Sequence, residues 1–171
     1  MKHAMIDLET LGVGMGAPLF EIGLSFFDFD NEVDGSRLIS VDVMDVMWRT
    51  GFCPQPDTLR WWREQDYDPT INRRVSLSEA LSETTRLFEE FKPDYVWANS
   101  PSFDCIILEQ HYNALGLSKP WSFRQELDFR TVRWLAKQKG WTDPEGRSPS
   151  HNGEEDANQQ ADLLKEMIKY V

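Results

Sequence analysis

The sequence is poor in cysteine and in cations, and it has no long apolar run. Its 171 residues include only two cysteines, Cys53 and Cys105, far apart and without the spacing of a metal site. Two distant cysteines exclude a fold built on a disulfide framework, so we interpret both as buried free thiols in a reducing cytoplasm. No stretch of about 18 apolar residues occurs, which excludes a transmembrane helix and a membrane partner.

The N-terminal residues lack the apolar core of a signal peptide, because the acid Asp7 follows within a few residues. We therefore expect a cytoplasmic protein. A length of 171 residues suits one compact domain, 1–171. Hydrophobic residues make up 40% of the chain and include seven Trp and ten Phe, enough to bury a core without disulfides.

Cations are scarce: 18 Lys and Arg stand against 29 Asp and Glu, and the formal net charge is −11. Tight nucleic-acid binding depends on cations that contact phosphates, so this balance argues against a high-affinity binder. It does not argue against an enzyme that gathers carboxylates around divalent metal ions. Such ions reverse the local charge and can then attract phosphates.

Hydrophobic periodicity predicts strands first and then alternating helices and strands. Strands are expected at 3–8, 19–29, 37–48, 94–98 and 126–129, with the second and third joined through a turn at 31–35. Helices are expected at 57–65, 76–91, 102–115, 130–139 and 154–170, and a Pro- and Gly-rich loop at 143–153. This order predicts an α/β domain with a mixed central sheet of about five strands flanked by helices.

The first candidate for chemistry is the pair Asp7 and Glu9, directly after an apolar run. Alternate residues of a strand share a face, so both carboxylates point the same way. Two such carboxylates repel each other unless a cation lies between them, and their hard oxygen atoms suit Mg²⁺ or Mn²⁺. Taken alone, the pair is more simply interpreted as two acids on a solvated turn.

Two further segments carry candidate residues at the ends of elements. The segment 99–104 follows the fourth strand and opens a helix, where Asp104 could simply favour the helix N-terminus. His151 lies in the loop before the last helix, and Asp156 lies in the first turns of that helix. A loop histidine can approach a water molecule while a helix-borne acid stays fixed, but a lone histidine is usually a plain surface residue.

Together these segments resemble, in order and spacing, the DnaQ-like exonucleases of the DEDDh group, whose fold is ribonuclease H-like. That family has Asp-x-Glu-Thr on its first strand, then Asn-x(2–3)-Phe/Tyr-Asp, then His-x(4)-Asp. The matching residues here are Asp7 and Glu9, then Asn99, Phe103 and Asp104, then His151 and Asp156. The chain is most similar to a small phage and bacterial branch with an exoribonuclease-like domain, through residues 8–12, 58–62, 102–108 and 128–131. Residues 153–155 depart from the usual filler between His and Asp but keep the spacing.

The resemblance implies a 3′→5′ exonuclease that uses two divalent cations, Mg²⁺ or Mn²⁺. Asp7, Glu9 and Asp156 would hold one cation, and Asp7 with Asp104 the second. Two cations roughly 4 Å apart can stabilise the attacking and the leaving oxygen of an in-line displacement. His151 would be the general base on the metal-bound water, because an imidazole exchanges protons near neutral pH. The product would be a nucleoside 5′-monophosphate.

The resemblance also points to substrate-binding residues. It places Leu8 and Thr10 beside the terminal nucleotide, with Leu8 against its base. Core packing is the alternative for Leu8. Asn99 and Phe103 belong to the second motif and are further candidates for substrate contact.

Aromatic and cationic residues on two predicted helices could extend the substrate site. Trp61 and Trp62 could stack on bases, although adjacent helix residues face different directions, so at least one is expected in the core. Arg130, Arg133 and Lys137 share a helix face and could follow a phosphate backbone. The simpler interpretation of these cations is a solvated face near a helix C-terminus.

The expected partner is a nucleic-acid 3′ end, single-stranded or in a 3′ overhang, and the sequence does not distinguish DNA from RNA. Exonucleases of this kind are often homodimers, but no interface can be identified in the sequence. Two other functions stay open, namely a catalytically silent nucleic-acid-binding module on the same fold and a metal phosphoesterase for small molecules. A silent module would need neither the four acids nor the histidine, so their presence counts against it.

Overall fold

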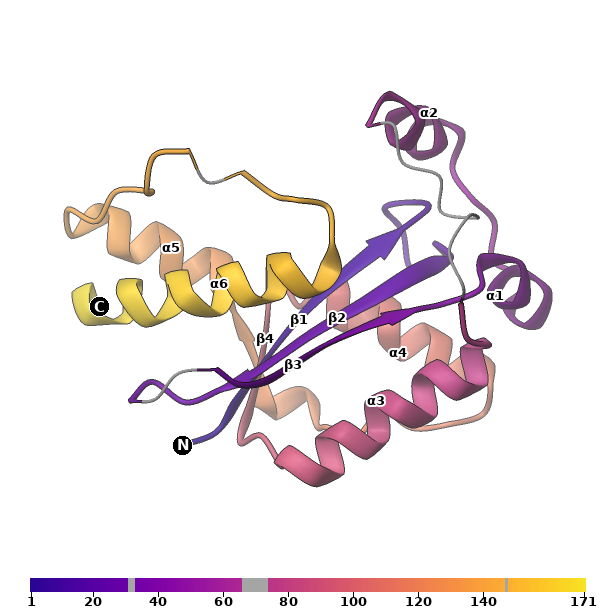
Figure 1. Ribbon diagram of the computed structural model, residues 1–171, viewed down its shortest axis with the longest axis horizontal. Coiled ribbons are helices and arrows are strands. Elements are labelled where there is room, and N and C mark those ends of the chain that lie inside the picture. Colours follow the sequence, from indigo (N-terminus) through magenta and orange to yellow (C-terminus); the bar gives the residue numbers. More distant parts are fainter. Residues whose placement is uncertain (31–32, 66–73, 147) are drawn as a thin grey trace.

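The chain folds into a five-stranded mixed sheet with helices on both faces (Figure 1). The structure, a computed structural model, describes residues 1–30, 33–65, 74–146 and 148–171. The strands are β1 (His3–Thr10), β2 (Leu19–Phe27), β3 (Val33–Ser40), β4 (Tyr95–Ala98) and β5 (Glu126–Asp128), in the sheet order β3-β2-β1-β4-β5. The first three strands are antiparallel, whereas β4 and β5 run parallel to β1. The predicted α/β class is confirmed, and the architecture agrees with a ribonuclease H-like exonuclease fold.

Six α-helices of the described residues flank the sheet. They are α1 (Val43–Thr50), α2 (Pro56–Glu64), α3 (Leu77–Phe91), α4 (Asp104–Ala114), α5 (Phe129–Gln138) and α6 (Gly153–Met167), with 3-10 turns at Phe123–Gln125 and Ile168–Tyr170. One core cluster joins the sheet to α3 and α4, and a second joins it to α5 and α6. In the part of the chain that the structure describes, none of the helices combines the length and apolarity that crossing a membrane requires.

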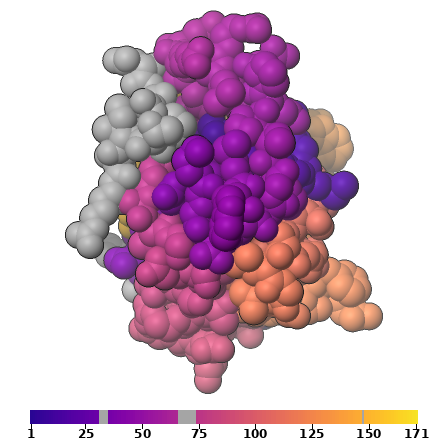
Figure 2. Space-filling view, turned by 90° about the vertical axis from the view of Figure 1, so that its right-hand side faces the viewer, coloured from indigo at the N-terminus to yellow at the C-terminus, as the bar shows by residue number. Residues whose placement is uncertain are grey.

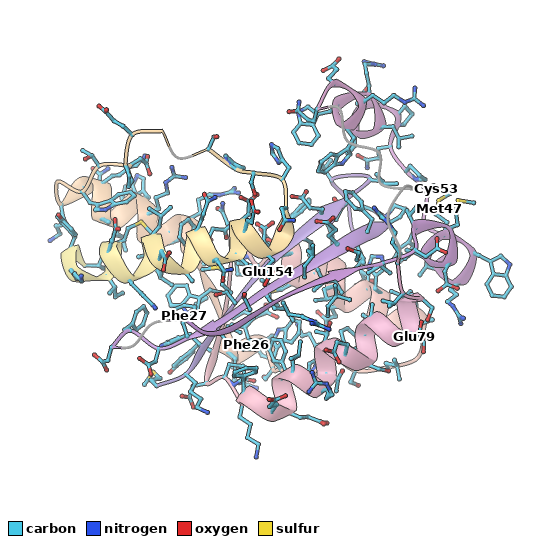
Figure 3. All side chains as sticks on the ribbon, in the orientation of Figure 1. Phe26, Phe27, Met47, Cys53, Glu79 and Glu154 are labelled. Atoms are coloured by element: carbon cyan, nitrogen blue, oxygen red, sulfur yellow. The ribbon has the colours of Figure 1, made fainter. Side chains whose placement is uncertain are left out.

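Side chains alternate between the two faces of the sheet, and this alternation decides where the candidate acids point. The neighbours Phe26 and Phe27 of β2 point toward α3 and α6 respectively (Figure 3). On β1, Ala4, Ile6 and Leu8 belong to the cluster with α3 and α4, whereas Met5 belongs to the cluster with α5 and α6. The next odd-numbered residues of β1, 7 and 9, therefore face the α6 side.

The N-terminal end of α6 crosses the sheet where two glycines meet. A Cβ atom on Gly23 of β2 would lie 1.9 Å from the carbonyl oxygen of Gly153, which is closer than any real contact. Gly23 is also the sheet partner of Asp7. Because neither glycine has a side chain, α6 can approach closely enough to carry Asp156 over the face of β1 that bears the candidate acids.

The predicted third strand at 37–48 is wrong in its second half. There β3 ends at Ser40, and α1 begins at Val43. The Asp42 carboxylate caps this helix by accepting hydrogen bonds from the backbone N–H groups of Met44 at 2.9 Å and Asp45 at 3.4 Å. Valine and methionine made this segment look strand-like, but the buried Val43 and Val46 have helical spacing.

Other boundaries differ less from those expected. The predicted turn at 31–35 lies partly on residues 31 and 32, outside the described residues, and β3 already begins at Val33. Helix α2 begins with Pro56 in its first turn, one residue before the predicted start. The predicted cap of α3 is confirmed, since Ser76 forms a capping box with Glu79, which is labelled in Figure 3. Both cysteines are free, but Cys53 (Figure 3) is exposed, so its predicted burial is wrong, and only Cys105 is buried.

Candidate active site

One cavity of about 260 Å³ collects residues from all three sequence motifs. Its walls come from the end of β1, the start of α4, the start of α5, and the loop and first turns of α6. The candidate residues on its border are Asp7, Leu8, Glu9, Asn99, Phe103, Asp104, His151 and Asp156. Thr10 borders an adjoining cavity of about 480 Å³. The fold therefore brings these residues together, while their catalytic roles stay predictions.

Asp7 and Glu9 stand on the face of β1 that is covered by α6. The Asp7 carboxylate accepts a hydrogen bond of 2.6 Å from the side-chain amide of Gln160. Burial, together with the charge of Asp104, raises the pKa of Asp7 well above its usual value. Burial and the Asp7 charge raise the pKa of Glu9 to about 9. Ionisation of both carboxyl groups is therefore unfavourable when no cation is bound beside them.

Asp104 begins α4 and is tied directly to β1. Its carboxylate accepts a hydrogen bond of 3.0 Å from the backbone N–H of Leu8, the residue between the two β1 acids. Burial raises the pKa of Asp104 to about 7, although backbone hydrogen bonds and the charge of Arg130 act in the opposite direction. The residue is 4% exposed, so Asp104 is fixed in place by its contacts rather than free in solvent.

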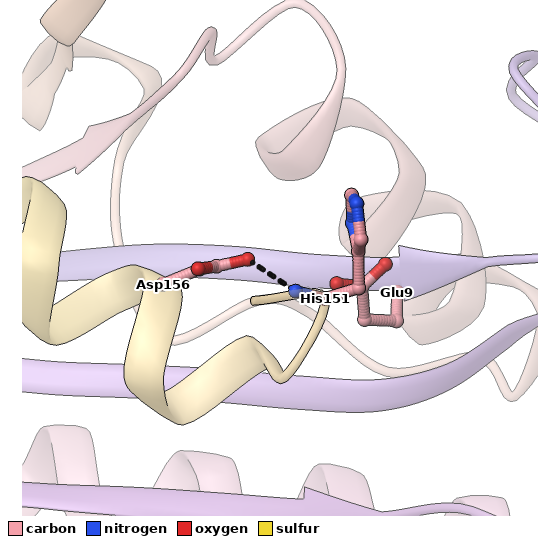
Figure 4. Close-up of side chains that lie close together, drawn as sticks. All are labelled: Glu9, His151 and Asp156. Carbon is pink, nitrogen blue, oxygen red and sulfur yellow. Dashed lines mark hydrogen bonds between the residues drawn. The ribbon is translucent and has the colours of Figure 1, made fainter. Parts of the chain in front are cut away.

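Asp156 and the loop before it fix the position of His151 (Figure 4). The Asp156 carboxylate accepts hydrogen bonds from the backbone N–H groups of Ser150 at 2.8 Å and His151 at 3.0 Å. His151 adopts a left-handed backbone conformation with φ of 58°. Potential ligand atoms of Glu9, His151 and Asp156 lie within 4.8 Å of one another.

The set of donors fits a divalent cation. Within the described part of the chain, Arg133 is the only lysine or arginine that borders the cavity, and its guanidinium already contacts Asp143 at 2.6 Å. Among the described residues, the charge of Arg130 acts on Asp104, but burial still raises the pKa of that acid, so the repulsion among the buried acids is offset only in part. Carboxylate oxygens are the ligands that Mg²⁺ and Mn²⁺ prefer. The residues that would hold such ions are Asp7, Glu9, Asp104 and Asp156.

The candidate substrate residues lie at the boundary between the two cavities. Leu8 is only 5% exposed and packs in the core, yet it borders both cavities, as does Phe103. The hydroxyl of Thr10 donates to the carbonyl oxygen of Gly12 at 2.7 Å. The carbonyl oxygen of Asn99 accepts a hydrogen bond of 3.1 Å from Arg130. Leu8 thus packs in the core, which was the alternative for this residue, and it also borders both cavities, while its contact with a base stays a prediction.

Both tryptophans of α2 border the second cavity, but they differ in burial. Trp62 is buried and donates its indole N–H to the carbonyl oxygen of Thr10 at 2.9 Å, which confirms that one of the pair is structural. Trp61 is 39% exposed and borders the second cavity. The rings of both contact the His151 ring edge-on, at centroid distances of 4.8 Å for Trp61 and 5.9 Å for Trp62.

Three residues near the site were missed from the sequence. Gln160 binds Asp7, Glu21 adds a buried acid next to Glu9 in the sheet, and Gly23 admits α6. The carboxylate of Glu21 also accepts a hydrogen bond of 3.3 Å from the backbone N–H of Gly153. A lone acid in the otherwise apolar run 19–24 was the available signal for Glu21. Gln160 could have been suspected because it follows Asp156 by one helical turn.

An α/β fold with four carboxylates and a histidine around one cavity defines a candidate metal-dependent hydrolase. The family model of the Rv2179c-like 3′-5′ exoribonuclease domain matches residues 2–168, and the chain belongs to this family. Family membership indicates a 3′-5′ exonuclease and thus a nucleic-acid substrate. Comparison with curated proteins gives no match.

Proposed function

We propose that this protein is a divalent-metal-dependent 3′→5′ exonuclease of the DEDDh type that shortens RNA from its 3′ end. The observation that carries the proposal is the convergence of Asp7, Glu9, Asp104, His151 and Asp156, from three separate segments of the chain, on one cavity. The family description supports the 3′-5′ polarity and favours RNA as the substrate.

The acids divide into two groups around the cavity. Asp7, Glu9 and Asp156 would hold one cation, and Asp7 with Asp104 would hold the second. Two cations bound there would neutralise the charge that develops on the attacking and leaving oxygens of the phosphodiester. The hydrogen bond from Leu8 holds Asp104 beside β1, and Gln160 orients Asp7.

His151 acts as the general base that takes a proton from the attacking water. Its loop is fixed by the hydrogen bond to Asp156, and its ring is confined by Trp61 and Trp62. The terminal nucleotide would lie between Leu8 and Phe103, where the two cavities meet. This arrangement accepts a free 3′ end, either single-stranded or in an overhang, and releases a nucleoside 5′-monophosphate.

The proposal is tested by digesting matched RNA and DNA oligonucleotides, single-stranded and with 3′ overhangs, in Mg²⁺, in Mn²⁺ and in EDTA. We expect stepwise shortening of RNA from the 3′ end, 5′-monophosphate products, and no activity in EDTA. Activity after exhaustive chelation would exclude the mechanism. Hydrolysis of small phosphodiesters without shortening of oligonucleotides would instead identify a small-molecule phosphoesterase.

Two variants separate cation binding from proton transfer. Asp7→Asn should weaken Mn²⁺ binding and abolish nearly all activity. The matched control is Asp162→Asn, which makes the same change at an exposed acid of α6 that does not border the cavity. His151→Ala should keep Mn²⁺ binding and lower the single-turnover rate by about 10²–10⁴-fold, the usual contribution of a general base. A wild-type rate in His151→Ala would remove His151 from the mechanism.

A further inference from the structure

The outer face of α5 carries three cations and one tryptophan. Arg130, Arg133, Trp134 and Lys137 follow the spacing of one helix face, and the ten residues of α5 include no acid. Trp134 is 60% exposed. Because the chain as a whole has a net charge of −11, this stripe of cations stands in contrast to the rest of the molecule. We call these four residues the α5 stripe.

The α5 stripe begins at the rim of the candidate active site. Phe129, the first residue of α5, and Arg133 both border the cavity. Arg130 donates a hydrogen bond of 3.1 Å to the carbonyl oxygen of Asn99, which borders the same cavity. From Arg130 to Lys137 the helix rises by roughly 10 Å, at about 1.5 Å per residue. The stripe is therefore continuous with the cavity and leads away from it.

Two carboxylates of the described residues contact this stripe, and one of them, Asp128, caps α5 by accepting a hydrogen bond of 3.1 Å from the backbone N–H of Arg130. Asp143 pairs with Arg133 at 2.6 Å and also with Lys137. All three side chains are about one third exposed or more. Ion pairs exposed to this extent contribute little stability, so a phosphate can take the place of the carboxylate at small cost. Three cations against the two acids Asp128 and Asp143 leave the stripe with a net positive charge, which complements a phosphate backbone.

We propose that the α5 stripe binds the single strand upstream of the 3′-terminal nucleotide. Trp134 stacks on a base, while Arg130 and Lys137 contact phosphates. This inference rests on the proposed function, because the strand must leave the cavity in order for its 3′ end to be cleaved there. Cations interleaved with an exposed aromatic ring hold single strands without reading their sequence. A surface of this kind lets the enzyme advance along any RNA.

The first test compares a decanucleotide with a dinucleotide as substrates of the wild type, Trp134→Ala and Trp134→Phe. Only the longer substrate reaches the stripe. Loss of one stacked base should raise the KM for the decanucleotide by roughly 5–150-fold, so the ratio of kcat/KM between decanucleotide and dinucleotide should fall. Trp134→Phe should restore most of that ratio. Trp48→Ala is the matched control, since Trp48 is 81% exposed on α1, at the end of the molecule shown in Figure 2.

The second test uses salt. Binding of a labelled decanucleotide is followed by fluorescence anisotropy in the Asp7→Asn background, where the strand is not cut. Lys137→Gln should reduce the slope of log affinity against log salt by about 0.7, the value for one phosphate contact on a single strand. Asp143→Asn should tighten binding at low salt, because it frees two cations.

The outcomes separate this inference from the proposed function. Suppose that the wild type cleaves both substrates. If Trp134→Ala then lowers both rates by the same factor, or changes neither rate, the stripe does not bind the strand. If the wild type cleaves neither substrate, the proposed function fails, and the anisotropy measurement alone decides on the stripe. Binding that is unchanged in Trp134→Ala and in Lys137→Gln overturns the inference in either case.

Discussion

At the scale of single residues, the hydrogen bond from Gln160 determines how the Asp7 carboxylate is oriented in the cavity. The Gln160 amide donates to the Asp7 carboxylate at 2.6 Å, from a position one helical turn beyond Asp156. A hydrogen bond to a charged carboxylate fixes its rotation and favours its ionised form. Gln160 is therefore a positioning residue, acting on bound cations through Asp7.

Replacing Gln160 with methionine keeps the length of the side chain but removes the donor. We predict that Gln160→Met lowers the affinity for Mn²⁺ by about 10–100-fold, as is typical when the partner of a metal ligand is lost. Isothermal titration calorimetry measures this without reference to catalysis. Gln159→Met is the control, because Gln159 also borders the cavity but, among the described residues, donates no hydrogen bond to an acid. Equal affinities in the two variants would show that Gln160 does not orient Asp7.

At the scale of elements, the site depends on how closely α6 approaches β2. Asp156 and Gln160 both stand on α6, whereas Asp7 and Glu9 stand on β1, next to β2 in the sheet. Two glycines, Gly23 and Gly153, form the crossing point. The absence of side chains on both glycines thus allows the close approach of α6, and the hydrogen bond from the Gly153 N–H to Glu21 of β2 joins the helix to the sheet there.

We predict that Gly23→Ala both destabilises the protein and impairs the site. Its Cβ would lie 1.9 Å from the backbone oxygen of Gly153, so the helix itself must shift. Overpacking of this kind costs about 1–3 kcal/mol or more, measurable by urea unfolding, and Mn²⁺ affinity should fall as well. In Gly16→Ala the nearest atom, on Phe52, lies at 3.7 Å, so that control should stay within about 0.5 kcal/mol of the wild type. A Gly23→Ala protein as stable as the control would mean that α6 is not held against the sheet here.

The same elements show how far the sequence allows prediction. Strand alternation and motif spacing were sufficient to expect Asp7 and Glu9 on one face and Asp104 at a helix start, because these depend on local geometry. The helix α1 was missed because its valines suit strands, and only the Asp42 cap reveals it. The Gly23–Gly153 crossing joins residues 130 positions apart, and no local pattern records such a contact.

At the scale of the whole molecule, the acidic site opposes folding when no cation is bound. Burial, followed by repulsion from neighbouring acids, raises the pKa of Glu9 from 4.5 to about 9 and that of Asp7 well above 3.8. Burial likewise raises the pKa of Asp104 from 3.8 to about 7. In the unfolded chain the same groups ionise near pH 4, so between about pH 4 and 9 the folded state binds more protons than the unfolded state.

The free energy of unfolding of the metal-free protein should therefore fall as the pH rises from 5.5 to 8.5, because stability is lost wherever the folded state holds the extra protons. Mg²⁺ should reverse this loss by replacing those protons, so the gain in Tm on adding Mg²⁺ should grow with pH. Thermal unfolding at three pH values, in EDTA and in Mg²⁺, measures both trends.

The variant Glu9→Gln should reduce the loss of stability with rising pH in EDTA, since it removes a carboxyl group whose pKa is among those raised most by folding. Glu155→Gln removes the same charge from an exposed position and should leave the slope unchanged. An equal slope in the wild type and Glu9→Gln would show that the decline reflects the general negative charge of the chain and not the carboxylates of the cavity.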